Sequence, residues 1–316
     1  MIARPPVTPR TEPAYLPAMP TNAETRAGLF AAMAAYGLWG FLPLYFQFLG
    51  DLPPLVILAH RIVWSVPTAL ILVIAAGKWG EFAGVFRAPR MMFTLLASSI
   101  AIAANWTIYI WAVTNERVLE GSLGYYINPL IVFLFAALFF GERFRPLQIL
   151  AVGIAAAGVL NQTLVVGEFP LVSLSLAVSF AIYGAIRKTT NVDSRIGFGL
   201  EALWLFLPAL AYLVFFLPPG VAAFGSGEPG FIALLLLAGP LTATPLILFA
   251  MGARRLRMST IGVLQFIAPT VQLFIGIAMG EDFTPGHAVT FGLIWTGVLV
   301  FTLAGRQPRL AVPTAD

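Results

Sequence analysis

Residues 119–146 read LEGSLGYYINPLIVFLFAALFFGERFRP, an apolar run with a proline near its middle and a charged turn at its end. Residues 258–285, MSTIGVLQFIAPTVQLFIGIAMGEDFTP, repeat this arrangement of an apolar run, a proline and a Gly-Glu pair. Residues 111–124 also align with residues 249–262 at a constant offset and without a gap. An internal match of this kind is the signature of a duplicated architecture, so the chain is interpreted as two related halves.

The composition is that of a membrane protein. Hydrophobic residues make up 59% of the 316, charged residues only 10%, and the mean hydropathy is +0.89. A water-soluble globule with this composition would lack the polar surface needed to cover itself. The chain has no cysteine and only two histidines, which excludes disulfides and thiol chemistry and argues against a metal centre. No cofactor is expected.

Ten apolar runs follow a polar, proline-rich tail at residues 1–26, which is expected to be disordered and cytoplasmic. Each run approaches the length of about 20 residues that a helix needs to cross a bilayer. Continuous runs without period-two alternation favour helices over a β-barrel. The sequence therefore predicts an all-α polytopic membrane protein with ten transmembrane helices. The runs lie near 27–48, 55–76, 91–112, 119–140, 146–164, 170–187, 197–217, 230–251, 260–279 and 287–304.

The basic residues predict the orientation of these spans. Of the eighteen Lys and Arg, all but Arg61 and Arg117 fall in the two tails or in the connectors on the same side as the N-terminus. Positive charge stays in the cytoplasm during insertion, so both termini, including the tail at 306–316, are expected there, in the plasma (inner) membrane. Basic residues spread over connectors in this way mark topology, and no nucleic-acid partner is expected even though the pI is near 9.6.

The duplication and the number of spans together predict an inverted repeat. Residues 27–165 and 166–305 would each hold five spans, and an odd number forces the two halves to enter the membrane in opposite senses. Inverted repeats around a central cavity are typical of carriers that work by alternating access. We therefore expect a binding site between the halves, near the middle of the membrane.

Several motifs resemble one known family. They are AHRIVWS (59–65), NWTIYIWAV (105–113), GERF (141–144) and RLRMSTIGVLQFIAPT (255–270), besides the opening stretch. In combination they are similar to the EamA branch of the drug/metabolite transporter superfamily, and more narrowly to its RarD-type members. The resemblance covers about residues 27–305. It implies an inner-membrane carrier that exports small metabolites or drug-like compounds through a cavity between two five-helix halves.

Two charges lie well inside predicted spans and are candidates for the transport chemistry. Arg61 and Glu201 occupy equivalent places when Trp64 is aligned with Trp204. Charges at this depth are costly unless they face protein or water, so we predict that Arg61 attracts an anionic group and that Glu201 takes part in ion coupling or gating. The alternative is that each only orients its helix. Arg187 with Lys188 is interpreted as a cytoplasmic topology anchor.

Prolines and polar residues inside the spans predict a polar space. Proline removes a backbone hydrogen bond and tends to kink a helix, and freed carbonyls in a bilayer need partners or cavity water. The alternative is that these prolines only shape helix packing. The predicted hinges are Pro129, Pro269, Pro240 and Pro245. The predicted substrate-path residues, besides Arg61 and Glu201, are Trp64, Asn105, Tyr109, Tyr125, Asn128, Thr242, Thr244 and Gln265. The predicted cavity wall consists of Trp39, Tyr183 and Trp204, for each of which core packing is the alternative.

The function that best fits these observations is secondary transport of a small organic solute such as a metabolite, an amino-acid-like compound or a drug. No GxxxxGK[ST] loop is present to bind ATP phosphates, so energy would come from the solute gradient or from a proton or ion gradient. A passive channel remains an alternative, and a membrane-embedded enzyme is a weaker one because acids, bases and ligands are scattered singly. The partners expected are the solute and the lipid bilayer, with the protein a monomer or a homodimer.

Overall fold

The computed structural model describes residues 21–50, 52–114, 118–166, 171–224, 227–278 and 285–306. In these ranges the regular elements are all helices. They are α1 (Asn22–Phe48), α2 (Pro54–Ala75), α3 (Trp79–Val85), α4 (Pro89–Thr114), α5 (Val118–Leu138), α6 (Pro146–Val166), α7 (Leu171–Thr189), α8 (Ser194–Phe215), α9 (Pro229–Arg255), α10 (Met258–Leu264), α11 (Ile267–Ala278) and α12 (Pro285–Arg306). Helix α1 begins five residues before the predicted span, because Thr21 and Glu24 form a capping box at its start.

Eight of the described helical stretches are long and apolar enough to cross a membrane, by length and composition. Two further apolar stretches, Gly124–Leu138 and Pro146–Asn161, are shorter. Large apolar side chains such as Phe93, Leu207 and Phe215, each more than 70% exposed, point away from the bundle. Such a surface suits lipid and not water, and the chain is a helical multi-pass membrane protein.

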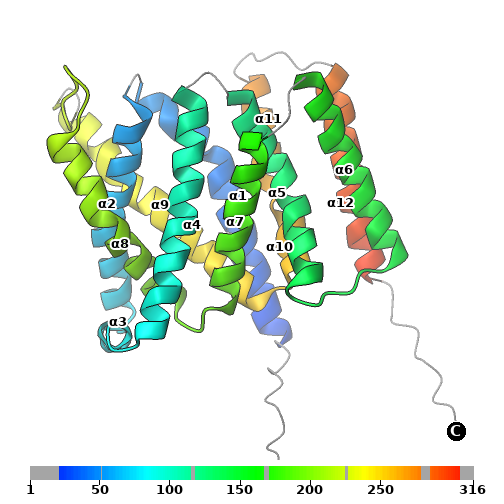
Figure 1. Ribbon diagram of the computed structural model, residues 1–316, viewed down its shortest axis with the longest axis horizontal. Helices are drawn as coiled ribbons and strands as arrows, with labels where there is room; N and C mark the ends of the chain where they lie inside the picture. The colour runs from blue at the N-terminus through cyan, green and yellow to red at the C-terminus, as the bar shows by residue number, and fades with distance from the viewer. Residues whose placement is uncertain are drawn as a thin grey trace, which may run out of the picture.

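The helices pack in pairs that join distant parts of the chain. Helix α6 lies along α12 at one edge of the molecule, and α2 lies along α8 toward the other edge (Figure 1). Between these edges α1 packs on α9 and α11, while α7 packs on α4 and α5. Helix α2 also contacts α9, and α8 also contacts α4.

Glycines let these helices approach closely. A Cβ atom at Gly239 of α9 would lie 2.2 Å from the carbonyl oxygen of Trp64, so α9 rests directly on the backbone of α2. A Cβ atom at Gly297 of α12 would lie 2.6 Å from the carbonyl oxygen of Ala151 in α6. Without a hydrophobic effect in lipid, close backbone approach of this kind is what holds membrane helices together.

Pro129 and Pro269 lie in different helical settings. Pro129 lies inside an uninterrupted α5, whereas the corresponding span of the second half is divided into α10 and α11 at Gln265 and Phe266. Pro269 falls in the first turn of α11, where its missing N–H would have had no partner within the helix. Helix α9 runs unbroken through Pro240 and Pro245, two of the predicted hinges, and is held on one side by α2.

One short helix was not predicted. Helix α3 lies in the connector between α2 and α4 and buries Phe82 and Val85 against Leu95, Ile196 and Leu200. It is only seven residues long, too short for its apolar pattern to stand out in the sequence.

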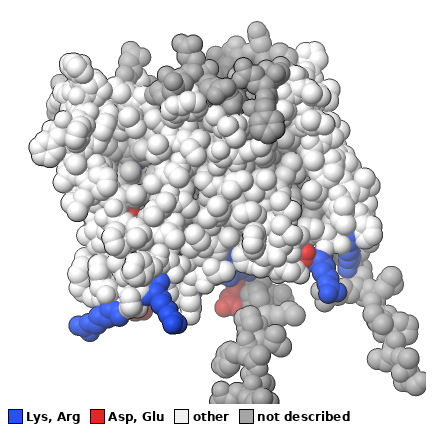
Figure 2. All heavy atoms as spheres, viewed as in Figure 1, with Lys and Arg blue, Asp and Glu red and all other residues white. Residues whose placement is uncertain are grey.

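Charge gathers at one end of the molecule. In Figure 2 the visible Lys and Arg side chains lie at the lower end, where α1 begins and α12 ends in Figure 1. We call this the basic end. The distribution matches the connector asymmetry of the sequence.

Candidate functional site

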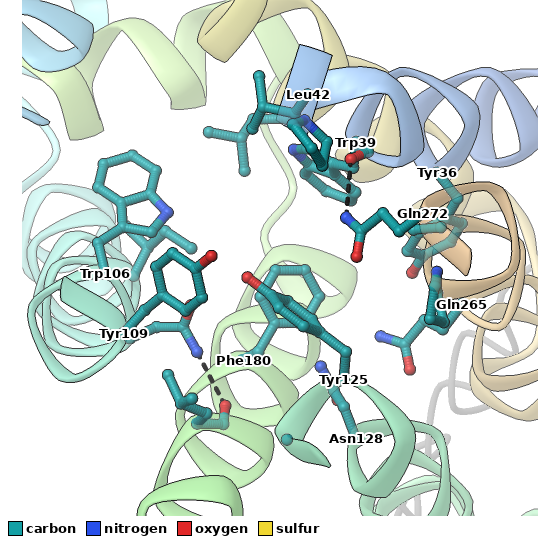
Figure 3. A pocket seen from close by; sticks show the side chains of 18 of the residues that line it. Tyr36, Trp39, Leu42, Trp106, Tyr109, Tyr125, Asn128, Phe180, Gln265 and Gln272 are labelled. Atoms are coloured by element: carbon teal, nitrogen blue, oxygen red, sulfur yellow. Dashed lines mark hydrogen bonds between the residues drawn. The ribbon is translucent and has the colours of Figure 1, made fainter. Parts of the chain in front are cut away.

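A cavity of about 440 Å³ lies within the bundle. Its wall is built by α1, α2, α4, α5, α7, α9 and α11, so both halves of the chain contribute. Figure 3 shows Trp106 and Tyr109 of α4 facing Gln265 and Gln272 across the space.

The cavity is displaced away from the basic end. Helices α1 and α4 start at that end, and their lining residues, Tyr36 to Gln47 and Ile102 to Tyr109, come from their second halves. Helix α2 runs in the opposite sense, and its lining residue, Arg61, comes from its first half. The part of the bundle nearer the basic end is filled by packed side chains.

Arg61 is the only charged residue among the described residues that line the cavity. Its Nε atom donates to the Thr242 hydroxyl at 3.0 Å. The guanidinium carbon lies 5.3 Å from the ring centre of Trp106 and 5.8 Å from that of Phe46. Ring faces stabilise a guanidinium but leave most of its donors free, and in the described part of the chain no carboxylate forms an ion pair with it.

Five amide side chains add polar groups to the cavity wall: Gln47, Asn105, Asn128, Gln265 and Gln272. Asn105 donates to the Leu176 carbonyl at 2.8 Å and to Ser179 at 3.1 Å. Gln272 donates to the Trp39 carbonyl at 3.1 Å (Figure 3). These two amides join helices across the wall. The side-chain oxygens of Asn128 and Gln265 are buried and have no hydrogen-bond partner among the described residues.

A buried acceptor without a hydrogen-bond donor lowers the stability of the folded protein by about 1–3 kcal/mol. A ligand that donates a hydrogen bond to the acceptor recovers this cost, so an unpaired acceptor in a cavity wall indicates a ligand site. In either orientation, Asn128 and Gln265 offer both a donor and an acceptor to a molecule in the cavity.

Aromatic rings close the cavity toward the basic end. Tyr36, Trp39 and Phe180 line it, and Phe249 packs against all three with ring centres 5.3–6.2 Å apart. Tyr183 stacks on Phe249 from the far side of this layer. We call these five residues the aromatic floor.

A buried ion pair lies beyond the floor. Arg187 of α7 and Glu201 of α8 are 1% and 2% exposed, and Nη1 of Arg187 is 3.4 Å from Oε1 of Glu201. Ser98 of α4 donates to Glu201 at 2.5 Å, and the Tyr183 hydroxyl donates at 3.4 Å. Arg187 was expected to be a topology anchor at the membrane surface. Instead its guanidinium lies against Gly197 of α8, where a Cβ would be only 2.1 Å from Nη1.

Two further side chains fasten the junction between α9 and α10. Glu142 accepts from the backbone N–H of Met258 at 2.6 Å and pairs with Arg257 at 3.2 Å. Lys188 donates to the carbonyls of Ala253, at 3.2 Å, and Leu256 at the end of α9. At the basic end, Glu142 thus ties the connector between α5 and α6 to α10, and Lys188 ties α7 to the end of α9.

The structure brings together most, but not all, of the residues singled out in the sequence. Nine of them lie at or next to the cavity: Trp39, Arg61, Asn105, Tyr109, Tyr125, Asn128, Gln265 and Pro269 line it, and Thr242 holds Arg61. Trp204 is 41% exposed and Thr244 is exposed, both outside the lining. Trp64 donates to Nδ1 of His60 instead of entering the cavity.

Some lining residues did not follow from sequence reasoning. Gln272 stands two turns after Gln265, and Trp106 and Phe46 supply the rings under Arg61. The spacing of the two glutamines in one apolar span was a usable signal. Trp106 and Phe46 give none, because aromatic residues are frequent throughout this chain.

In the described residues no group of three or more His, Asp or Glu is placed to hold a metal ion.

Comparison with known proteins gives concordant results. Residues 26–162 match the model of the EamA-like transporter family. The chain is 38% identical over 281 residues to the protein named RarD of Escherichia coli (strain K12), covering 89% of this chain and 95% of the relative. It is 42% identical over 287 residues to a Bacillus subtilis (strain 168) protein named uncharacterized transporter YojE, covering 90% and 96%.

A solved structure supports the fold. A crystal structure titled only as that of a protein superposes with a TM-score of 0.67 at 21% identity, covering 90% of this chain and 99% of the other. At that identity the likeness concerns the fold alone.

Proposed function

This chain belongs to the EamA-like transporter family, and we propose that it is a secondary carrier that exports a small organic solute bearing an anionic group. The observation that carries the proposal is the single guanidinium of Arg61 in an aromatic and amide-lined cavity inside a membrane bundle. A cation without a carboxylate partner favours a ligand that brings negative charge.

The remaining lining groups support a small amphipathic solute. Rings of Trp39, Trp106, Tyr109 and Tyr125 offer apolar surface, while Asn128 and Gln265 offer hydrogen bonds. A carboxylate at Arg61 with an amine or hydroxyl at the two amides would satisfy both, as in an amino-acid-like metabolite. We assign Asn105 and Thr242 to positioning, because both already bind protein atoms.

We further infer that the fold is two inverted five-helix repeats, residues 27–165 and 166–305. The helix contacts support this. Exchanging α1 with α7, α2 with α8, α4 with α9 and α5 with α10–α11 turns three of the main observed pairs into three others. Thus α1 on α9 becomes α7 on α4, and α2 on α9 becomes α8 on α4. Pairs α2–α8 and α6–α12 map onto themselves, as expected at a pseudo-twofold axis.

Alternating access follows from this architecture. If the basic end faces the cytoplasm, as the positive-inside rule predicts for the plasma membrane, the cavity lies toward the outside and the cytoplasmic side is closed. Exchange of the two repeats' conformations would move the opening to the cytoplasm. Pro129, Pro269, Pro240 and Pro245 are the proposed hinges, with the break at Gln265 and Phe266 as the place of least helical restraint.

Transport needs an energy source. In a secondary carrier this source is either a proton or ion gradient or the gradient of the solute itself. A passive channel is the competing reading. We propose a monomer or homodimer as the working unit, because a cavity made by one chain needs no partner subunit.

The test starts from cells. Metabolites inside and outside cells that lack or overexpress the protein are compared, and the carboxylates that change are tested in proteoliposomes with and without a pH gradient. We expect saturable uptake and counterflow of at least one anionic solute. Non-saturable flux would support a channel, and no flux of any candidate would contradict the proposal.

Arg61→Gln provides the matched variant, and Arg90→Gln its control. Arg90 is exposed at the start of α4, away from the cavity, so its loss leaves transport intact. If both variants insert in the membrane and transport equally, the cavity arginine does not bind the solute.

A further inference from the structure

In the buried Arg187–Glu201 pair the carboxylate is well hydrogen-bonded and the guanidinium is not. Nε and Nη1 of Arg187 have no hydrogen-bond partner among the described residues, and Nη2 donates only to the Ser194 carbonyl, at 3.3 Å. The ion pair with Glu201 therefore supplies most of the compensation for the guanidinium charge. Burying such a pair costs several kcal/mol per ion, and the cost is recovered only with good geometry.

A second, small cavity brings Glu201 close to the central one. It is lined by Glu201 and Ser65, and it shares Ile102, Trp106 and Leu246 with the central cavity. One layer of side chains thus separates the carboxylate from the space that holds Arg61. On the other side, the pair is sealed from the basic end by Ser194 and the packing of Gly197 on the guanidinium.

We propose that Glu201 is the proton-binding carboxylate of this carrier and that its ion pair with Arg187 is the contact through which a proton opens the cytoplasmic end. This inference rests on the proposed carrier function and adds the coupling ion, the residue that binds it and the contact it controls.

The step is a simple proton transfer. A proton from water in the central cavity binds the Glu201 carboxylate and forms a neutral carboxyl group. Arg187 then keeps its charge in an apolar site without a counter-charge, and separation of α7 from α8 at the basic end returns it to water. Release of the proton to the cytoplasm restores the pair, so one proton enters for each outward cycle of the solute.

Few other titratable groups lie close enough to Glu201 to bind the proton in its place. Among the residues that the structure describes, the titratable side chains facing Glu201 are Arg187 and Tyr183, both from α7. Helix α4 presents the hydroxyls of Ser98 and Ser99, α2 presents Ser65, and α9 presents Leu246. Arg254, at the end of α9, is close enough for its charge to act on Arg187, and it favours release of Arg187 once Glu201 is neutral.

The first test detects the proton directly. Dicyclohexylcarbodiimide modifies protonated carboxyls in apolar surroundings, and the purified protein is treated with it in nanodiscs and mapped by mass spectrometry. We expect modification of Glu201 at about pH 5.5 to exceed that at about pH 8 by at least about fivefold. The exposed Glu81 serves as the internal control and shows no such site-specific increase. An unmodified Glu201 at both values would overturn the proposal.

The second test detects the opening. Thr190, 4% exposed beside the end of α7, becomes a single reporter in Thr190→Cys because the natural chain has no cysteine. In Thr190→Cys alone, we expect maleimide labelling to be about fivefold faster at about pH 5.5 than at about pH 8. Adding Glu201→Gln should make labelling rapid and independent of pH. Adding Glu201→Asp or Glu81→Gln should leave the pH response in place.

A pH response that survives in Glu201→Gln would overturn the inference. If Glu201→Gln fails to fold, Glu201→Asp and the carbodiimide mapping of the natural chain still decide it. Neither test needs a transported solute. A failed transport experiment with an intact pH response would count against the proposed substrate, and the reverse result would count against the proton site alone.

Discussion

The carboxylate of Glu142 lies 2.6 Å from the backbone nitrogen of Met258 and caps the first turn of α10, although the two residues are 116 positions apart. Its other contacts, with the N–H and hydroxyl of Ser259 and the side chain of Arg257, complete the cap. The connector between α5 and α6 thereby supplies the negative charge that the start of α10 lacks.

Glu142→Ala should destabilise the protein by about 2 kcal/mol, because it removes charged hydrogen bonds from a side chain that is only 8% exposed. Glu142→Gln keeps one acceptor and is expected to lose less. Thermal unfolding in detergent, followed by tryptophan fluorescence, measures both.

The control for that comparison is Glu81→Ala, which removes an exposed carboxylate paired only with Lys78 among the described residues. A surface pair of this kind is worth at most about 1 kcal/mol. Equal losses from Glu81→Ala and Glu142→Ala would show that the α10 cap has no special weight.

Asp193 should make stability depend on pH. It caps α8 and accepts from the Arg195 backbone at 2.9 Å and its guanidinium at 3.0 and 3.1 Å. Burial alone would raise the pKa of Asp193, but the hydrogen bonds from Arg195 and the charges of Arg195 and Lys78 lower it to about 2, from an ordinary 3.8.

A lowered pKa means that the folded state favours the ionised form, so this stabilisation is complete above about pH 4 and is lost as the pH falls toward 2. The stability difference between the natural chain and Asp193→Asn should therefore shrink between pH 4 and the lowest pH that the detergent micelle tolerates. Since Asn still caps the helix, Asp193→Ala should be the less stable variant by about 1 kcal/mol. A difference that stays constant with pH would contradict the ionised cap.

The close contact of α9 with α2 predicts a sharp difference between glycines. Gly239→Ala would place a methyl group 2.2 Å from the Trp64 carbonyl oxygen, so α9 must move away and stability should fall by about 2 kcal/mol or more. Gly153→Ala and Gly292→Ala are the controls, because a Cβ meets nothing within 4 Å at either position. They should be neutral or slightly stabilising, since alanine favours the helix. Melting temperatures of the three variants give the comparison, and a well-tolerated Gly239→Ala would show that this contact yields easily.

The long helices were predictable because a helix that crosses a bilayer needs a continuous apolar run of about 20 residues, and such runs are visible in the sequence. The run at 55–76 became α2, Pro54–Ala75, within one residue at each end. The division of the span at 260–279 was not predictable in position, because proline weakens a helix without fixing where it breaks. The polar cavity lining was partly visible, since Asn105, Asn128 and Gln265 are amides that cannot face lipid.

Arg187 shows why the rest was hidden. An Arg-Lys pair at a helix end is the pattern of an interfacial anchor, and Lys188 does bind helix-end carbonyls at the basic end. Arg187 turns inward only because position 197 on the neighbouring helix has no side chain. That complementarity between a glycine and a guanidinium exists in three dimensions and has no local sequence signal.

The site itself is tested best by separating the charge of Arg61 from its shape. Arg61→Lys keeps the positive charge but loses the planar group that lies 5.3 Å from the Trp106 ring centre and bonds to Thr242. For the anionic solute identified in proteoliposomes, we expect Arg61→Lys to raise KM by about tenfold with a smaller change in kcat. A tenfold rise in KM corresponds to about 1.4 kcal/mol of binding free energy, which we attribute to the lost bidentate contact. Arg61→Gln should abolish saturable uptake. Equal KM values for the natural chain and Arg61→Gln would place the anion elsewhere, whereas equal values for Arg61→Lys and the natural chain would mean that charge alone, without the guanidinium plane, holds the solute.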